Sequence, residues 1–173
     1  MSTFDSTKTL LRMLLQRVVE GKLQLPDFQR GWVWDDEHIR SLMVSIARSF
    51  PIGAVMLLET GGETRFQVRP VEGVDLPPHS GGLAQELILD GQQRLTSLTQ
   101  VLMLDRPVAT RDAKGRELRL HYYFNIEKAL EGPESLEDAI VAVDENRAQR
   151  SDFGRKVDLD LSSSSLTAPF IHA

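Results

Sequence analysis

Apolar residues recur at helical spacing in three segments of the chain, and we predict an amphipathic helix in each. The segments are residues 6–20, 36–50 and 93–104. Ser6 or Thr7 is the expected N-cap of the first helix and Gly21 marks its expected end. Asp35 or Asp36 is the expected cap of the second. The predicted apolar face of the second helix consists of Ile39, Leu42, Met43, Ile46 and Phe50.

Other apolar runs predict β-strands, with shorter or weaker elements between them. The strands are residues 22–26, 54–59, 86–90, 117–126 and 155–162. Residues 54–59 are apolar on both pleats, so this strand is expected to be covered on two sides. Residues 61–73 suggest a turn and a partly exposed strand, and residues 106–116 a polar loop. Short helices fit residues 127–132 and 134–140, and the acidic stretch at residues 134–147 is expected to form a solvated face.

The alternation of helices and strands predicts the α/β (α+β) class, as a compact mixed-sheet domain with flanking helices. We expect an N-terminal helix over residues 1–22 and the main domain over residues 23–161. The Ser-rich residues 162–173 show no packing pattern, so we expect a tail that is unstructured or marks a truncation point.

Length and composition favour one globular domain. The chain has 173 residues, of which 41% are hydrophobic and 26% are charged. Its net charge of −5 argues against a protein that coats the DNA backbone, although a local basic pocket stays compatible. It contains no cysteine, which excludes disulfides and thiolate chemistry. No apolar run is long enough to span a bilayer, so we expect no membrane partner and a cytoplasmic location.

The segment LILDGQQRLTSL, residues 87–98, predicts a strand-to-helix turn that suits an anion. Gly91 would let a ligand approach the backbone, Arg94 would grip phosphate, and Asp90 would contact a metal ion or water. The alternative is purely structural. In that interpretation Asp90 caps the helix, Gly91 makes the turn, and Gln92, Gln93 and Arg94 form an exposed first turn.

A second polar and aromatic cluster lies in LPDFQRGWVW, residues 25–34. Aromatic side chains beside Arg30 suit stacking on a base or clamping a flat ligand. The alternative is that Phe28, Trp32 and Trp34 only fasten this loop to the core, which is the more common fate of tryptophan.

The order LPDFQRGWVWDDEHIRSLMVSI, FPIGAVMLLE, LILDGQQRLTSL and YYFNIEKALEG resembles a known family. It is similar to the N-terminal domain of GmrSD-type modification-dependent restriction systems, the subunit S class with a ParB/sulfiredoxin-like fold. The resemblance runs from about Leu23 to about Leu161. It implies that the DGQQR segment binds and hydrolyses a nucleotide, which assigns the site to Asp90, Gly91, Gln92, Gln93 and Arg94.

The resemblance also implies roles for the rest of the site. Phe28, Gln29, Arg30 and Trp32 would line the same pocket or sense a modified DNA group. We expect a nucleoside triphosphate, with Mg²⁺ held at Asp90, to lie against Gly91 and the helix N-terminus. In this picture Arg94, Arg30 and Gln29 bind the phosphates, and Arg94 and Arg30 neutralise developing charge. Gln92 or Gln93 positions the attacking water.

These residues predict an NTP-hydrolysing sensor domain of a DNA-modification-dependent, anti-phage restriction system. The alternatives are a noncatalytic module that recognises modified DNA or a partner protein, and a ParB-like nuclease. The expected partners are a nucleotide, modified DNA, an HNH-type nuclease domain or subunit, and, as an open possibility, a second copy in a homodimer. We do not expect the HNH part in this chain, because the histidines beyond Gly91 lie in no HNH-like cluster.

Overall fold

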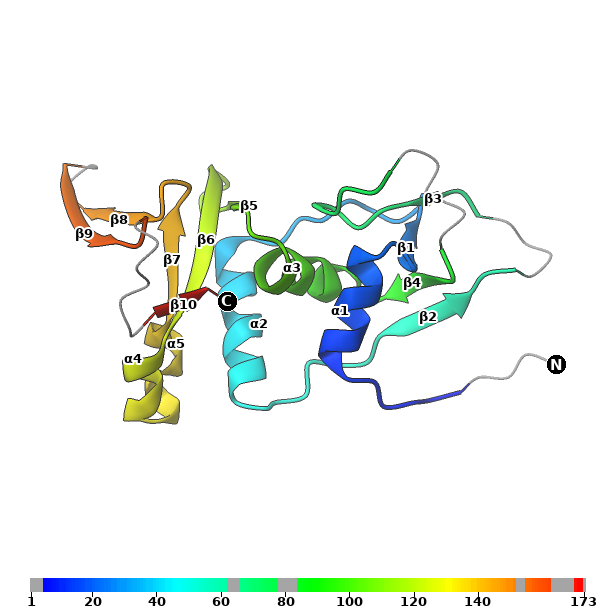
Figure 1. The fold of residues 1–173 in the computed structure, drawn as a ribbon, viewed down its shortest axis with the longest axis horizontal. Helices are drawn as coiled ribbons and strands as arrows, with labels where there is room; N and C mark the ends of the chain where they lie inside the picture. The colour runs from blue at the N-terminus through cyan, green and yellow to red at the C-terminus, as the bar shows by residue number, and fades with distance from the viewer. Residues whose placement is uncertain (1–4, 62–65, 78–83, 152–154, 163–169, 173) are drawn as a thin grey trace.

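The structure is a computed structural model that describes residues 5–61, 66–77, 84–151, 155–162 and 170–172. Figure 1 shows two sheets at opposite ends of the long axis, with helices α2 and α3 between them. The predicted α+β class is confirmed. The ParB/sulfiredoxin-like fold and the proposed domain boundaries stay predictions.

The first sheet has four strands in the order β2-β4-β1-β3. They are β1 (Leu23–Pro26), β2 (Met56–Glu59), β3 (Val68–Arg69) and β4 (Glu86–Asp90). The two inner strands, β1 and β4, are parallel, and the two outer strands are antiparallel to their neighbours. All four residues of β1 are buried, because the sheet packs against α1 (Leu11–Val19) and α3 (Gln92–Met103).

The second sheet is built around the long strand β6. It consists of β5 (Val108–Arg111), β6 (Glu117–Asn125), β7 (Ile140–Asp144) and β10 (Phe170–His172). Leu120 pairs with both Val108 and Asp144, so β5 and β7 lie on opposite edges of β6. The strand β10 pairs with the far end of β6, and β8 (Ala148–Ser151) and β9 (Lys156–Asp160) form a separate two-stranded ribbon. Short helices lie between β6 and β7: α4 (Ile126–Glu131), the 3-10 turn η2 (Pro133–Ser135) and α5 (Leu136–Ala139).

Helices α2 (Asp36–Ala47) and α3 connect the two halves of the molecule. Leu42 of α2 and Leu98 of α3 belong to the core under the first sheet. Ile39 of α2 and Val101 of α3 belong to the core against the second sheet. Each of these two helices therefore packs on one face against the first sheet and on another face against the second sheet.

The structure corrects the predicted ends of two helices. Residue Leu10 occupies the N-cap position of α1, and no side chain caps this helix, so the predicted cap at Ser6 or Thr7 is wrong. Helix α2 ends at Ala47, and Ser49 then takes a positive φ of 56°. Phe50 therefore leaves the helical path and is 57% exposed, so it is not part of the predicted apolar face.

Several strand predictions also fail because tertiary position overrides the local pattern. The β2 strand, expected to be covered on two sides, is an edge strand in which Met56 and Leu58 are 49% and 38% exposed. The predicted loop at residues 106–116 contains β5. The acidic stretch expected to be solvated contains β7, in which Ile140 and Val143 are buried. An unstructured tail is wrong for Phe170–His172, which form β10.

Candidate functional site

The DGQQR segment forms the predicted strand-to-helix turn. Strand β4 ends at Asp90, Gly91 is the N-cap residue of α3, and the helix begins at Gln92. Gly91 has a φ of +87°, which favours glycine, and a Cβ there would lie 3.0 Å from the Val55 Cγ2 atom. The side of Gly91 on which a side chain would project is therefore filled by Val55, and not by space for a ligand.

Asp90 does not cap α3, so the structural alternative for this residue is wrong. The cap position belongs to Gly91, and no side chain accepts a hydrogen bond from the first turn. The Asp90 side chain is 72% exposed, and its nearest cation is Arg94, with the Nη2 and Oδ2 atoms 3.8 Å apart. The carboxylate is thus accessible to solvent at the end of β4.

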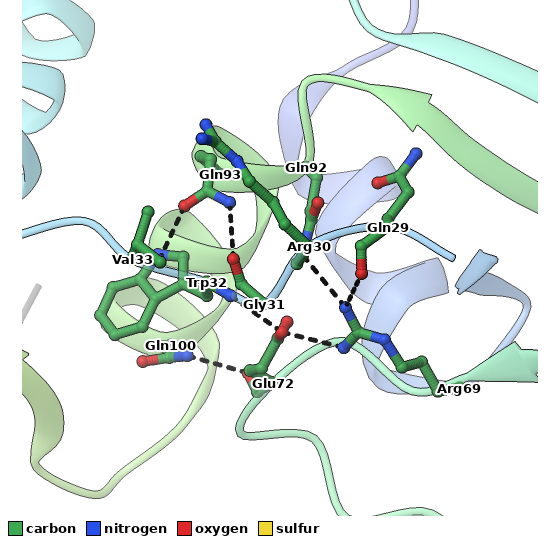
Figure 2. A network of polar contacts seen from close by, with 10 residues as sticks. All are labelled: Gln29, Arg30, Gly31, Trp32, Val33, Arg69, Glu72, Gln92, Gln93 and Gln100. Carbon is green, nitrogen blue, oxygen red and sulfur yellow. Dashed lines mark hydrogen bonds and ion pairs between the residues drawn. The ribbon is translucent and has the colours of Figure 1, made fainter. Parts of the chain in front are cut away.

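The two glutamines of the turn hold the loop that carries the second predicted cluster. Gln92 is 7% exposed, and its Nε2 atom donates to the Arg30 carbonyl at 2.7 Å. Gln93 donates to the Gly31 carbonyl at 3.2 Å and accepts from the Val33 N–H at 3.0 Å. The structure therefore brings the two clusters together, as predicted, through hydrogen bonds between side chains and backbone (Figure 2).

Further hydrogen bonds fix the other side of this loop, which runs over residues 29–34. Gln29 donates to the carbonyls of Ile88 and Leu89 in β4, at 2.7 and 2.9 Å. Arg69 donates to the carbonyl of Gln29 at 3.1 Å and to the Glu72 carboxylate at 2.8 Å. Figure 2 shows Arg69 and Glu72 on the side of the loop opposite Gln92 and Gln93.

Glu72 is the centre of this second set of contacts. Its Oε1 atom also accepts from the Trp32 N–H at 3.0 Å, and its carbonyl accepts from the Gln100 amide at 2.9 Å. Sequence reasoning missed Glu72, Arg69 and Gln100, because nothing in a charged stretch such as VRPVE indicates which distant loop it contacts.

Arg94 is bound to a third segment, the turn between α2 and β2. Its guanidinium donates to the carbonyls of Ile52 and Ala54, the latter at 2.9 Å. Gly53 lies directly under it: a Cβ at this position would be 2.1 Å from the Arg94 Nη1 atom. Two of the arginine's five N–H donors therefore serve the protein itself.

Phe28 and Arg30 are the exposed members of the second cluster. The Phe28 side chain is 69% exposed and touches Phe66 in an edge contact with ring centroids 5.7 Å apart. The Arg30 guanidinium has no hydrogen-bond or ion-pair partner among the described residues. Trp32 donates through its indole N–H to the Ser97 hydroxyl at 2.9 Å and, like Trp34, packs against the core. Fastening to the core is confirmed for the tryptophans and wrong for Phe28.

A cavity of about 280 Å³ lies between α2 and the turn that Arg94 holds. Its lining includes Trp34 and His38 on one side and Pro51 and Ile52 on the other. The Asp35 carboxylate accepts from the His38 backbone N–H at 2.9 Å and contacts the His38 Nδ1 atom at 2.6 Å. These hydrogen bonds lower the pKa of Asp35, first through the backbone N–H and then through the ring.

Comparison with known proteins identifies the family to which this arrangement belongs. A family model described as the N-terminal domain of the GmrSD restriction endonuclease matches residues 11–166. The chain belongs to this family. An uncharacterized protein of Methanocaldococcus jannaschii is 36% identical to it over 102 residues. The aligned part covers 57% of this chain and only 17% of that protein.

Membership of the GmrSD N-terminal family confirms the predicted resemblance and connects the chain with restriction endonuclease systems. The match includes both the 29–34 loop and the DGQQR turn. Among the residues that the structure describes, no helix is long and apolar enough to cross a membrane.

The predicted Mg²⁺ ligand, Asp90, can be tested for chemical fit. In the described ranges no three acidic, histidine or cysteine side chains gather in a group that could hold a metal ion. Mg²⁺ at a nucleotide site is commonly held by one or two carboxylates together with substrate phosphates and water. The exposed Asp90 carboxylate fits that mode, in which the nucleotide brings much of the ligand set.

None of the four histidines belongs to the DGQQR sequence. His121 is 4% exposed within β6. His38 is exposed and belongs to the cavity described above. His79 lies outside the described residues, as does the side chain of His172.

Proposed function

We propose that this domain binds and hydrolyses a nucleoside triphosphate, as the sensor part of a DNA-modification-dependent restriction system. One observation carries the proposal: the exposed carboxylate of Asp90 and the exposed guanidinium of Arg30 flank a helix start that no side chain caps. The backbone of Arg30 lies against the first turn of α3, because its carbonyl accepts from Gln92.

The chemistry of this arrangement suits a polyphosphate. The first N–H groups of a helix have no partner within the helix, and together with the helix dipole they attract anions. Arg30 and the remaining donors of Arg94 would neutralise phosphate oxygens. Asp90 is the residue that would hold Mg²⁺, which would supply further charge neutralisation.

The glutamines have a different role in this proposal from the one that the sequence predicts. The Nε2 atoms of Gln92 and Gln93, and the Oε1 atom of Gln93, contact the loop backbone. Their main contribution is to hold Arg30 in place beside the helix start. The predicted positioning of water by either glutamine stays a prediction.

Phosphate release is the direct test, and Asp90→Asn is the decisive variant. The side chain of Asp90 is exposed and caps nothing, so its amide variant should fold like the parent. We expect a loss of at least tenfold in phosphate release with Mg²⁺ present. Asp75→Asn is the matched control, because Asp75 is 87% exposed and lies outside the turn.

Arg30→Ala is expected to weaken nucleotide binding, measured by titration calorimetry, by about tenfold at low salt. Arg111→Ala is its control, since Arg111 is an exposed arginine without a partner among the described residues. The proposal is overturned if the parent neither binds nor hydrolyses any of the four common nucleoside triphosphates. It is equally overturned if Asp90→Asn releases phosphate at the parent rate.

The noncatalytic alternative, recognition of modified DNA, is favoured by the exposure of Phe28. An aromatic side chain that is 69% exposed next to an arginine suits stacking on an unpaired base. Retention of modified and plain DNA duplexes at one salt concentration tests this alternative. Phe28→Ala should remove any difference between the two duplexes, and Phe50→Ala, at another exposed phenylalanine, should leave it unchanged.

A further inference from the structure

The cavity beside α2 has walls of two chemical kinds. Its apolar lining comes from Trp34 on one side and from Pro51 and Ile52 on the other. The polar side comes from successive turns of α2, through His38, Ser41 and Ser45. A flat apolar wall beside a few polar groups is the usual composition of a site for a small planar ligand.

Two residues of the DGQQR turn hold opposite walls of this cavity. Gln93 accepts from the N–H of Val33, the residue that precedes Trp34. Arg94 donates to the carbonyl of Ile52 on the other wall. The turn therefore determines the distance between the two walls, although these glutamine and arginine atoms contact backbone rather than a ligand.

The polar side of the cavity carries a histidine in a defined orientation. The ionised Asp35 carboxylate only accepts hydrogen bonds, so the Nδ1 atom of His38, 2.6 Å away, must donate. In the neutral imidazole, the Nε2 atom is then an acceptor. Ser45 donates to the Ser41 carbonyl at 2.9 Å, and the Ser41 hydroxyl has no partner among the described residues.

We infer that this cavity binds the base of the nucleotide, with the ring against Trp34 and its polar edge toward His38 and Ser41. The inference rests on the proposed function, because it assumes that the ligand of the DGQQR turn is a nucleotide. In the proposed function the DGQQR turn contacts only the phosphates of the nucleotide. The inference places the base in the cavity, in contact with residues of α2.

The size of the cavity agrees with a site that holds only the base and leaves the phosphates at the DGQQR turn. A volume of about 280 Å³ lies just below the range for small-molecule sites, about 300–1,000 Å³. It suits one ring system rather than a whole nucleoside triphosphate. The second cavity, about 290 Å³, is lined by residues such as Val19, Val74 and Arg106, and none of its lining belongs to the DGQQR turn or the 29–34 loop.

Ser41→Leu tests the inference by filling the cavity from an exposed helical position. Leucine is a better helix former than serine, so α2 should remain intact. Ala47→Leu is the matched control, because Ala47 is exposed on the same helix and does not line the cavity. Binding of each nucleoside triphosphate, each nucleoside and inorganic tripolyphosphate is measured by calorimetry for the parent and both variants.

The expected result is selective. Ser41→Leu should weaken binding of the preferred nucleoside triphosphate and its nucleoside at least tenfold, and leave tripolyphosphate binding within twofold of the parent. Ala47→Leu should match the parent with every ligand. His38→Phe, which retains a ring but removes the acceptor, should reduce the preference between bases.

The outcomes separate this inference from the proposed function. If Ser41→Leu binds nucleotides and nucleosides as the parent does, the base does not lie in this cavity, while phosphate release by the parent would still support hydrolysis. If the parent binds tripolyphosphate as tightly as any nucleoside triphosphate, the base makes no contact and the inference is wrong. If the parent binds no nucleotide, both proposals fail.

Discussion

The 29–34 loop and the β6–β7 pair are held by different interactions. Side-chain amides and a guanidinium hold the loop through its backbone, while Arg30 in the loop and Phe28 just before it are exposed. Strand pairing and buried side chains hold β6 and β7, with Tyr122 and Ile140 each 1% exposed.

The two kinds of interaction should have different effects: buried apolar contacts on stability, and the loop hydrogen bonds on the geometry of the candidate site. Burial of apolar surface contributes much of the free energy of folding, whereas one hydrogen bond adds only about 0.5–1.5 kcal/mol net. The second sheet should therefore determine whether the domain folds. The loop contacts should determine where the candidate site residues lie, at a small cost in stability when they are lost.

The largest expected effect is at Ile140, in the apolar region. Ile140→Ala removes a fully buried side chain from β7 and leaves a cavity, so we expect a loss of about 2–5 kcal/mol in the free energy of unfolding. Urea denaturation measures it. Leu130→Ala, at a side chain that is 81% exposed, should stay within about 0.5 kcal/mol of the parent. An equally small change at Ile140 would remove the contrast between the two regions.

Arg94→Lys should have the next largest effect, because lysine cannot reproduce the forked contact with the Ile52 and Ala54 carbonyls. We expect a loss of about 1.5–3 kcal/mol, the usual range for hydrogen bonds to a charged group. Amide hydrogen exchange should also become faster in the turn at residues 52–56. Arg12→Lys, at an exposed arginine of α1, is the control. Unchanged exchange in the turn would show that Arg94 does not hold it.

Asp35→Ala should cost about 1 kcal/mol at neutral pH through loss of the α2 cap. Hydrogen bonds from His38 lower the pKa of the Asp35 carboxyl from its ordinary value of 3.8. A lowered pKa gives stability that is present above the ordinary value and lost as the pH falls through the folded value. The difference between parent and variant should therefore persist at pH 6 and shrink below pH 3.8.

Thermal unfolding at several pH values measures this difference. Asp75→Ala, at an exposed carboxylate that caps no helix, should leave the parent's stability within about 0.5 kcal/mol across the same range. A difference for Asp35→Ala that grows on acidification would contradict the sign of the pKa shift.

Gln93→Ala should have the smallest effect on unfolding and a visible effect on the loop. It removes two hydrogen bonds to the loop backbone, each worth about 0.5–1.5 kcal/mol at most, and water can replace them at this exposed edge. We expect the tryptophan emission to move to longer wavelength, because Trp32 and Trp34 flank the released N–H of Val33. Gln85→Ala, at an exposed glutamine outside the loop, should leave the spectrum unchanged.

Elements with a clear period could be predicted from the sequence, and edge elements could not. The β4 strand, its turn and α3 follow directly from LILDGQQRLTSL, because an apolar run meets glycine and then an amphipathic segment. Strand β5 was missed because its inward residues, Val108 and Thr110, are few and alternate with the exposed Ala109 and Arg111 inside a polar stretch. Strand β2 was misjudged because an apolar pattern does not reveal that no further strand covers its outer edge.

For the candidate site, the family resemblance implied which segments meet but not what their polar atoms contact. The resemblance implied that the FQR residues line the same pocket as the DGQQR turn, and the hydrogen bonds of Gln92 and Gln93 join the two segments. The expected free donors of Arg94 are partly bound to a turn about forty residues earlier in the chain. Every residue has a backbone carbonyl, so the sequence cannot indicate which carbonyls accept hydrogen bonds from Arg94.

The sequence by itself determined the family, through the resemblance of its motifs. It also determined the α+β class and the strand-to-helix turn at Gly91, since these depend on local periodicity and on a positive φ that favours glycine. Only the tertiary structure decided which polar groups are accessible. Packing buried Gln92 against the loop, bound Arg94 to the turn at Ile52 and left Asp90 exposed. A polar side chain is satisfied by whichever partner the fold brings within reach, and that choice depends on contacts between distant segments.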